Sequence, residues 1–251
     1  MTPDVVVDIG NSRIKWGVCR VDRVVDVIRL PLDDEAAWEA ALAQLPPTQY
    51  ARKWAVASVN PPAMLRFIGW SYNHGGTVVF ENYKDLPIRL NVDEPENVGL
   101  DRLLGAIAAK SMAPVGTPVI TVDVGTAVTV NLIDAAGVFQ GGAILPGPRL
   151  MAQALHEHTE KLPLVQATDL LEEFGPAKNT TAAIRLGIDA ALNGGVMAIL
   201  SLLADECAIA PCVFITGGGS DLLAARTPTL PETHLVPTLN LEGIRIAAEA
   251  L

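Results

Sequence analysis

Cysteine and aromatic residues are scarce in this sequence. The 251 residues include three cysteines, Cys19, Cys207 and Cys212, which are odd in number and lack paired metal-ligand spacing. Such usage argues against a disulfide framework or a zinc site and fits a reducing cytosol. Aromatic residues make up 5% of the chain, but hydrophobic residues reach 50%, which predicts a substantial core, and the length of 251 residues suits one large domain or two of modest size.

An excess of positive charge is also missing. The formal net charge of -10 argues against binding to nucleic acid or to an anionic membrane surface. It does not argue against phosphorylated small molecules, which a few local cations and glycine amides bind. The start MTPDVVVD has no signal-peptide pattern, and no apolar run approaches the roughly 18 residues of a membrane span. We therefore expect a cytoplasmic protein with neither a membrane nor a nucleic-acid partner.

Several catalytic signatures are absent. The sequence contains no G-x-x-x-x-G-K-[ST], H-E-x-x-H or G-x-S-x-G, which removes P-loop, zincin and α/β-hydrolase interpretations. His156 and His158 are two residues apart, so on a helix they face different directions.

What the sequence does contain is a long internal repeat. An apolar strand at residues 5–8 leads through a polar turn into an alternating strand at 13–18 and a third at 23–32. Residues 117–147 repeat this order, so that Asp8 matches Asp123 and Gly10 matches Gly125. Helix-rich sequence follows both units. The pattern predicts an α/β protein of two similar lobes, residues 1–115 and 116–251.

The two matching turns share a carboxylate, a spacer, a glycine and a small polar residue: Asp8-Ile9-Gly10-Asn11-Ser12 and Asp123-Val124-Gly125-Thr126. Glycine lets successive amides point at an anion, and the carboxylate is a candidate ligand for a divalent cation. A single turn of this kind is usually an ordinary hairpin. Two turns that end the first strand of a repeat favour a grip on a triphosphate from both sides.

Two further features have competing interpretations. Lys15 lies on the polar face of the return strand, where it either reaches a phosphate or is a solvated edge lysine. Gly217-Gly218-Gly219 follows a strand and precedes Ser220, which suits close approach to a nucleotide or merely a tight backbone passage. The glycines do not form a Rossmann fingerprint, because they are consecutive and no βαβ unit with an acidic partner follows.

Asp101 and Arg102 open a predicted helix at residues 99–112. Asp101 complements the helix dipole there, but an arginine at a helix start does not, and it suggests an anionic target. A general base beside an anion-binding arginine suits a substrate with both a hydroxyl and a carboxylate.

Taken together, these segments resemble the acetate and sugar kinase/Hsc70/actin superfamily and, within it, the type III pantothenate kinase family. The resemblance follows the order of the chain. The segments that carry it are DIGNSRIKWG at 8–17, GLDR at 99–102, DVGTAVT at 123–129, GGAILPG at 141–147, NTTAAIRLGI from Asn179, and GGG at 217–219.

The resemblance implies two lobes of ribonuclease H-like fold, each a βββαβαβα unit, and ATP-dependent phosphorylation of pantothenate in coenzyme A synthesis. It also implies Mg²⁺, a monovalent cation (K⁺ or NH₄⁺) and a homodimer. Asp101 would accept the proton, and Asp123 would lie at the cation site, with Asp8 as a second metal ligand. The remaining residues would bind substrate (Gly99, Leu100, Asp101, Arg102, Thr180), ATP phosphates (Asp8, Ile9, Gly10, Asn11, Ser12, Arg13, Ile14, Lys15, Thr126) and the adenosine side (Gly217, Gly218, Gly219).

Two positions depart from the family pattern. Val92 stands where the family often has tyrosine, which affects the wall of the pantothenate pocket, and Asn131 replaces an aspartate that usually ends the second phosphate motif. Two alternatives therefore stay open: another small-molecule kinase of the superfamily, or a non-catalytic ATP-binding regulator such as a transcription accessory factor.

Overall fold

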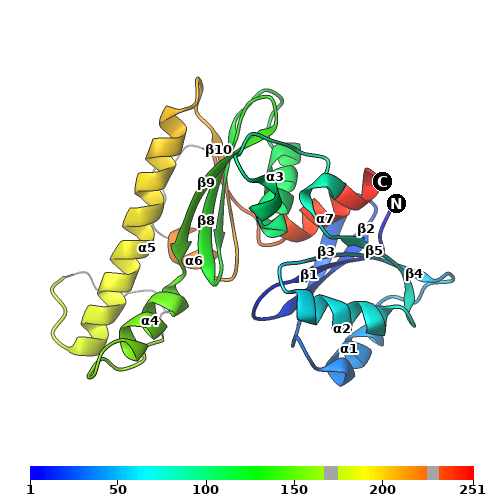
Figure 1. The fold of residues 1–251 in the computed structure, drawn as a ribbon, viewed down its shortest axis with the longest axis horizontal. Helices are drawn as coiled ribbons and strands as arrows, with labels where there is room; N and C mark the ends of the chain where they lie inside the picture. Colours follow the sequence, from blue (N-terminus) through cyan, green and yellow to red (C-terminus); the bar gives the residue numbers. More distant parts are fainter. Residues whose placement is uncertain (167–174, 225–231) are drawn as a thin grey trace. The chain divides into compact units, whose positions relative to one another are not determined.

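The computed structural model describes residues 1–166, 175–224 and 232–251, which form two compact units (Figure 1). The first unit comprises Met1–Met112, Gly137–Phe139 and Thr238–Leu251, and the second comprises Ala113–Ala136 and Gln140–Pro237. The sequence predicts a single division near residue 115. The observed division is discontinuous, because the C-terminal helix packs within the first unit.

A five-stranded sheet with the order β3-β2-β1-β4-β5 forms the centre of the first unit. β1 is antiparallel to β2, and β2 is antiparallel to β3, whereas β1, β4 and β5 run parallel. The strands are β1 Val5–Ile9, β2 Ile14–Arg20, β3 Arg23–Leu30, β4 Arg52–Ser58 and β5 Gly75–Phe80.

The second unit repeats this topology. Its strands are β7 Val119–Val124, β8 Ala127–Ile133, β9 Val138–Pro146, β10 Cys212–Thr216 and β11 Thr233–Leu235, in the order β9-β8-β7-β10-β11. β7 and β8 are antiparallel, and β7, β10 and β11 are parallel, as in the first sheet. β6 (Arg89–Leu90) pairs with Val138 and Phe139, the first two residues of β9, and all four belong to the first unit. The duplicated α/β fold predicted from the sequence is confirmed.

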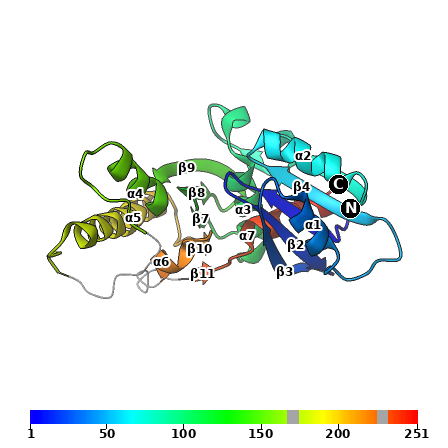
Figure 2. The ribbon, with the colours of Figure 1, turned by 90° about the horizontal axis from the view of Figure 1, so that it is seen from below.

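Helices α1 (Glu35–Leu42) and α2 (Pro61–Ser71) cover one face of the first sheet (Figure 2). The core beneath them contains all four tryptophans of the chain, Trp16, Trp38, Trp54 and Trp70, together with Phe67. The ring centroids of the contacting pairs lie 5.1 to 6.0 Å apart, mostly edge to face, which is the arrangement that aromatic quadrupoles favour.

Helices α3 (Leu100–Met112) and α7 (Leu239–Glu249) lie on the other face and cross very closely. A Cβ at Gly243 would lie 2.0 Å from the backbone oxygen of Leu104, so only glycine fits there. Glu242 fixes α7 to the sheet: it is 5% exposed, accepts a 2.7 Å hydrogen bond from the backbone amide of Val24, and pairs with Arg245 at 2.7 Å.

Helix α5 (Thr180–Asp205) lies along one face of the second sheet (Figure 1). Leu192, Val196 and Leu200 join the core formed by β7, β8 and β10. The helix is nevertheless long and apolar enough to cross a membrane by length and composition, with 22% of its most apolar window buried. The sequence predicts no such segment, because no apolar run approaches about 18 consecutive residues. One side of α5 thus packs into the core, and its other side is exposed and weakly polar.

The remaining helices are α4 (Pro148–Glu157) and the short α6 (Ser220–Ala224), and 3₁₀ turns occur at Tyr83–Asp85 and Pro95–Asn97. α4 packs on the first part of α5 through Ala152, Ile184 and Ile188. The three cysteines are free thiols, as the sequence predicts.

The α3–α7 crossing predicts a position-specific effect of adding one methyl group. Gly243→Ala should lower the free energy of unfolding by about 1–3 kcal/mol, because the Cβ forces the two helices apart. Gly69→Ala in α2 is the matched control: a Cβ there meets nothing within 4 Å, so the change should be neutral or stabilise by up to about 1 kcal/mol. Urea unfolding of both variants measures the difference, and equal stabilities would contradict the close crossing.

Candidate active site

The first phosphate motif is a tight hairpin between β1 and β2. The backbone amide of Gly10 donates to the backbone oxygen of Arg13 at 3.1 Å, closing the turn. Ile9 and Ile14 are fully buried on either side of it, whereas Asn11, Ser12 and Arg13 are exposed. The motif is therefore a hairpin, and its polar residues are accessible to a ligand.

Asp8 and Lys15 face each other across this hairpin. They are cross-strand partners, and the Lys15 ammonium lies 3.1 Å from Asp8 Oδ2, with side chains 29% and 13% exposed. β2 has neighbours on both sides, so Lys15 is not the edge lysine of the alternative interpretation. The pair places a cation and a carboxylate side by side at the end of β1.

Asp101 lies in the first turn of α3, and its carboxylate folds back over the chain. Oδ1 accepts a 2.9 Å hydrogen bond from the backbone amide of Arg102. A Cβ at Gly99 would lie 2.6 Å from the same oxygen, so Gly99 leaves the space that the carboxylate occupies. A side chain at position 99 would therefore make this carboxylate shift.

Burial raises the pKa of Asp101 above its ordinary value, and the neighbouring charge of Asp8 raises it further. The hydrogen bond from the Arg102 amide and the charge of Arg102 act in the opposite direction. Asp8 and Asp101, far apart in sequence, are thus close enough to interact within the first unit. A carboxylate with a raised pKa is a better proton acceptor than an ordinary one, which fits a general base.

The Arg102 side chain is half-buried, and burial lowers its pKa, partly offset by Asp101. Its guanidinium carbon lies 5.5 Å from the ring centroid of Phe139, at the start of β9. Phe139 is fully buried. Nothing in the sequence around Phe139 marks it as the neighbour of a residue so distant in the chain.

The second phosphate motif has the same hairpin form in the second unit. Gly125 donates its backbone amide to Ala127 at 3.0 Å, and Asp123 has Thr129 and Thr216 as its cross-strand partners. Asp123 therefore faces hydroxyl-bearing residues, where Asp8 faces Lys15 and Ala57.

Two other glycine segments converge on this second turn. A Cβ at Gly147 would lie 2.3 Å from the backbone oxygen of Gly125 and 2.5 Å from that of Thr126. Gly217 adopts a φ of +96°, and a Cβ there would lie 2.4 Å from Asp123 Oδ1. Gly219 donates its amide to Val124 at 3.0 Å. Gly217–Gly219 therefore pass tightly over the backbone, directly against the second motif, and their approach to a nucleotide stays a prediction.

Asn131, one of the two departures, is 1% exposed. Its amide nitrogen lies 3.2 Å from Thr121 Oγ1 and 3.4 Å from Thr129 Oγ1, on the face of the sheet that carries Asp123. The amide thus completes a buried polar row without adding a charge.

Thr180 is exposed at the first position of α5, which Asn179 caps by accepting a hydrogen bond from the amide of Ala182. Among the described residues, no three His, Cys, Asp or Glu side chains gather as a metal site. Asp8 and Asp123 are single carboxylates, of the hard oxygen type that Mg²⁺ accepts beside phosphate oxygens.

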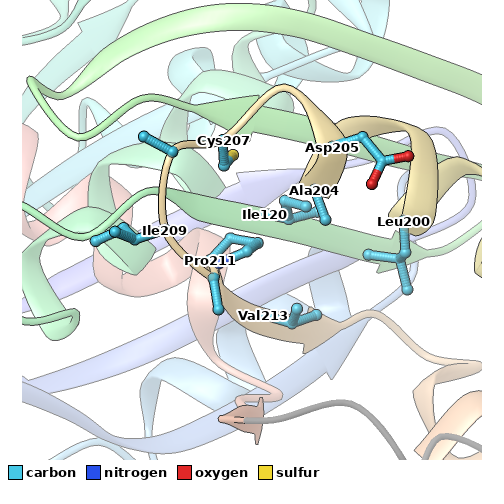
Figure 3. A pocket seen from close by; sticks show the side chains of 10 residues that line it. Ile120, Leu200, Ala204, Asp205, Cys207, Ile209, Pro211 and Val213 are labelled. Carbon is cyan, nitrogen blue, oxygen red and sulfur yellow. The ribbon is translucent and has the colours of Figure 1, made fainter.

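A pocket of about 260 Å³ lies elsewhere in the second unit, between the end of α5 and the start of β10 (Figure 3). Ile120, Leu200 and Val213 contribute apolar walls, and Cys207 lies at its side. Burial, and secondarily Glu206, raises the pKa of the Cys207 thiol, so it is no reactive thiolate. The pocket is at the amino ends of β7 and β10, opposite the motif turns at their carboxyl ends.

Comparison with known proteins identifies the family. The family model described as type III pantothenate kinase matches residues 5–201, most of the chain. The chain belongs to the type III pantothenate kinase family. A member from Listeria innocua is 31% identical over 253 residues, 96% of this chain and 95% of that protein. One from Halorhodospira halophila is 35% identical over 95% of each chain. One from Rhodopirellula baltica is 40% identical over 63% of this chain, and the aligned part is 59% of that protein.

Solved structures share the superfamily fold of these kinases at low sequence identity. A protein described as a Baf family transcriptional activator from Campylobacter jejuni has a TM-score of 0.61 at 17% identity, with 98% of each chain covered. An activator of 2-hydroxyisocaproyl-CoA dehydratase from Clostridium difficile, with bound ADPNP, has a TM-score of 0.54 at 11% identity, covering 98% of this chain and 96% of that one. At these identities the likeness shows the fold alone.

The raised pKa of Asp101 predicts that the family's G-x-D-R aspartate destabilises the fold. Burial disfavours the ionised carboxylate. The stability of the fold therefore falls as the pH rises from the pKa of Asp101 in the unfolded chain to its higher pKa in the folded protein. Asp101→Asn should therefore have a higher Tm than the parent protein at pH 8, and the advantage should disappear near pH 4. Asp22→Asn, which removes the same charge from an exposed turn, should show no such dependence. A lower Tm for Asp101→Asn at pH 8 would contradict this.

Proposed function

We propose that this protein transfers the γ-phosphoryl group of ATP to the primary hydroxyl of pantothenate, the first step of coenzyme A synthesis, in the cytoplasm. The observation that carries the proposal is the half-buried Asp101 carboxylate, with its raised pKa, beside Asp8 and Arg102 in a chain of this family. Phosphoryl transfer asks a protein mainly to position its reactants and to neutralise charge.

The proposed roles are those that the family resemblance implies for each residue. Asp101 orients the hydroxyl and accepts its proton, and Arg102 faces the substrate carboxylate. The accessible turn Gly10–Arg13, Lys15 and Thr126 hold the phosphates, and Gly217–Gly219 lie on the adenosine side. Gly99 and Leu100 complete the substrate side, together with Thr180.

Two metal requirements belong to the proposal. Mg²⁺, when bound, neutralises phosphate charge, and Asp8 and Asp123 are the carboxylates suited to it. A monovalent cation, K⁺ or NH₄⁺, would lie near Asp123. The buried amide of Asn131 adds no charge there.

The protein is further proposed to act as a homodimer through the exposed side of α5. This side carries mainly small and apolar residues, which allow close helix packing: Ala183, Gly187, Ala190, Ala191, Gly194, Ala198 and Leu202. Leu202 is 66% exposed. Thr180, a proposed substrate contact, begins the same helix, so dimerisation and substrate binding would involve one element.

The two alternatives make different demands on the same residues. A non-catalytic regulator needs no carboxylate of raised pKa beside an arginine, and Asp101 argues against it. A kinase for another small acid remains consistent with Asp101 and Arg102, and Val92 is the residue by which its substrate pocket would differ. Pantothenate is preferred because relatives over nearly the full chain carry its name.

The activity is tested by ADP release with ATP, Mg²⁺ and pantothenate, with and without K⁺ or NH₄⁺. Turnover is expected with pantothenate and not with sugars or other hydroxy acids. Asp101→Asn should lower kcat by at least about 100-fold, the size of a lost general base, while ATP binding persists. Asp22→Asn is the matched control and should retain kcat. Near-normal turnover of Asp101→Asn would remove Asp101 from its role, and bound ATP without any turnover would support the regulator.

The dimer is tested by placing a charge on the exposed side of α5. Ala191→Glu should dissociate the protein into monomers, because an unpaired carboxylate would be buried in the contact. Ala40→Glu, on the exposed side of α1, is the control and should leave the mass unchanged. Light scattering at several concentrations measures the outcome, and a parent protein that is monomeric throughout would refute the proposed dimer.

A further inference from the structure

Phe139 contacts both ends of the segment that carries the substrate motif. At one end, the backbone amide of Asn91 donates to the backbone oxygen of Phe139 at 2.9 Å, beside the β6–β9 pairing of Leu90 with Phe139. At the other end, the Phe139 ring lies 5.5 Å from the guanidinium carbon of Arg102. One residue from a distant part of the chain therefore joins the Asn91 end of this loop to its Arg102 end.

Phe139 is well packed within the first unit. It is completely buried there. Its backbone also pairs with Leu90 of β6. Its ring therefore gives the Arg102 side chain a packed surface to lie against.

The chemistry of the contact suits an arginine that binds an anion. Burial disfavours the charge of Arg102, and an aromatic face stabilises a guanidinium by about 0.5–2 kcal/mol. A carboxylate partner would occupy the in-plane N–H donors of the guanidinium. These are the donors that bind a carboxylate in the bidentate manner.

We propose that Phe139 is a positioning residue that holds Arg102 in place to bind the carboxylate of the substrate, and so sets the preference for an acid over its uncharged analogue. The proposal rests on the proposed function, because it takes Arg102 as a substrate contact. It adds a specificity role for a residue outside the phosphate and G-x-D-R motifs.

The test compares two buried phenylalanines of the first unit. Phe139→Leu removes the ring beside Arg102, and Phe80→Leu is the matched control, since Phe80 is 1% exposed in β5. Each is assayed with pantothenate and with pantothenol, in which a hydroxymethyl group replaces the carboxylate. Phe139→Leu should raise KM for pantothenate by roughly 3- to 30-fold, the span of a cation–π contact. Its KM for ATP and its kinetics with pantothenol should stay within about twofold of the parent protein.

A second variant separates the charge interaction from packing. Trifluorophenylalanine at position 139 keeps the shape of the ring but weakens its negative face, and it should raise KM for pantothenate in the same direction as Phe139→Leu. Arg102→Gln should abolish the preference for pantothenate over pantothenol, and Phe139→Leu should then add nothing further to it.

The outcomes are distinguishable. If the parent protein does not phosphorylate pantothenate, the proposed function fails. If it does, but Phe139→Leu and Phe80→Leu lose activity equally, or both substrates are affected alike, Phe139 is only a core residue and the inference is wrong. An unchanged KM for pantothenate in Phe139→Leu overturns it as well.

Discussion

The contact on which the first unit depends is the crossing of α3 and α7 at Gly243. It brings the backbones of the two helices together, and Glu242, which is paired with Arg245 and nearly solvent-free, fastens α7 to the sheet. α3 in turn begins with Asp101, a carboxylate that burial disfavours. Such a group stays in place only on a stiff support, so the C-terminal helix contributes to the site without touching it.

The two sheets show how one topology accommodates two kinds of chemistry. Each begins with a strand that ends in an aspartate, a glycine turn and a returning strand. In the first, the aspartate faces a lysine, and the turn is accessible. In the second, the aspartate faces threonines, and glycine segments press on the turn from two directions. The first turn therefore presents charged side chains, and the second turn presents closely packed backbone segments.

Much of this arrangement could be predicted from the sequence, because strand ends and glycine turns are local signals. The match of Asp8 with Asp123 is an example, since an apolar run and a polar turn mark each of them. The return of α7 to the first unit and the contact of Phe139 with Arg102 depend on packing between distant segments, for which the sequence contains no local mark. Gly99 lies between these two cases. Its motif could be recognised in the sequence, but the folded-back carboxylate of Asp101 beside it could not.

The gathering of all the tryptophans in a single core has a practical consequence. Trp16, Trp38, Trp54 and Trp70 lie in the first unit, and Trp16 adjoins Lys15 on β2. Tryptophan fluorescence therefore reports unfolding and rearrangement of the first unit and does not report those of the second unit. An optical titration reads events at the first turn, whereas unfolding of the half that contains α5 must be followed by circular dichroism or hydrogen exchange.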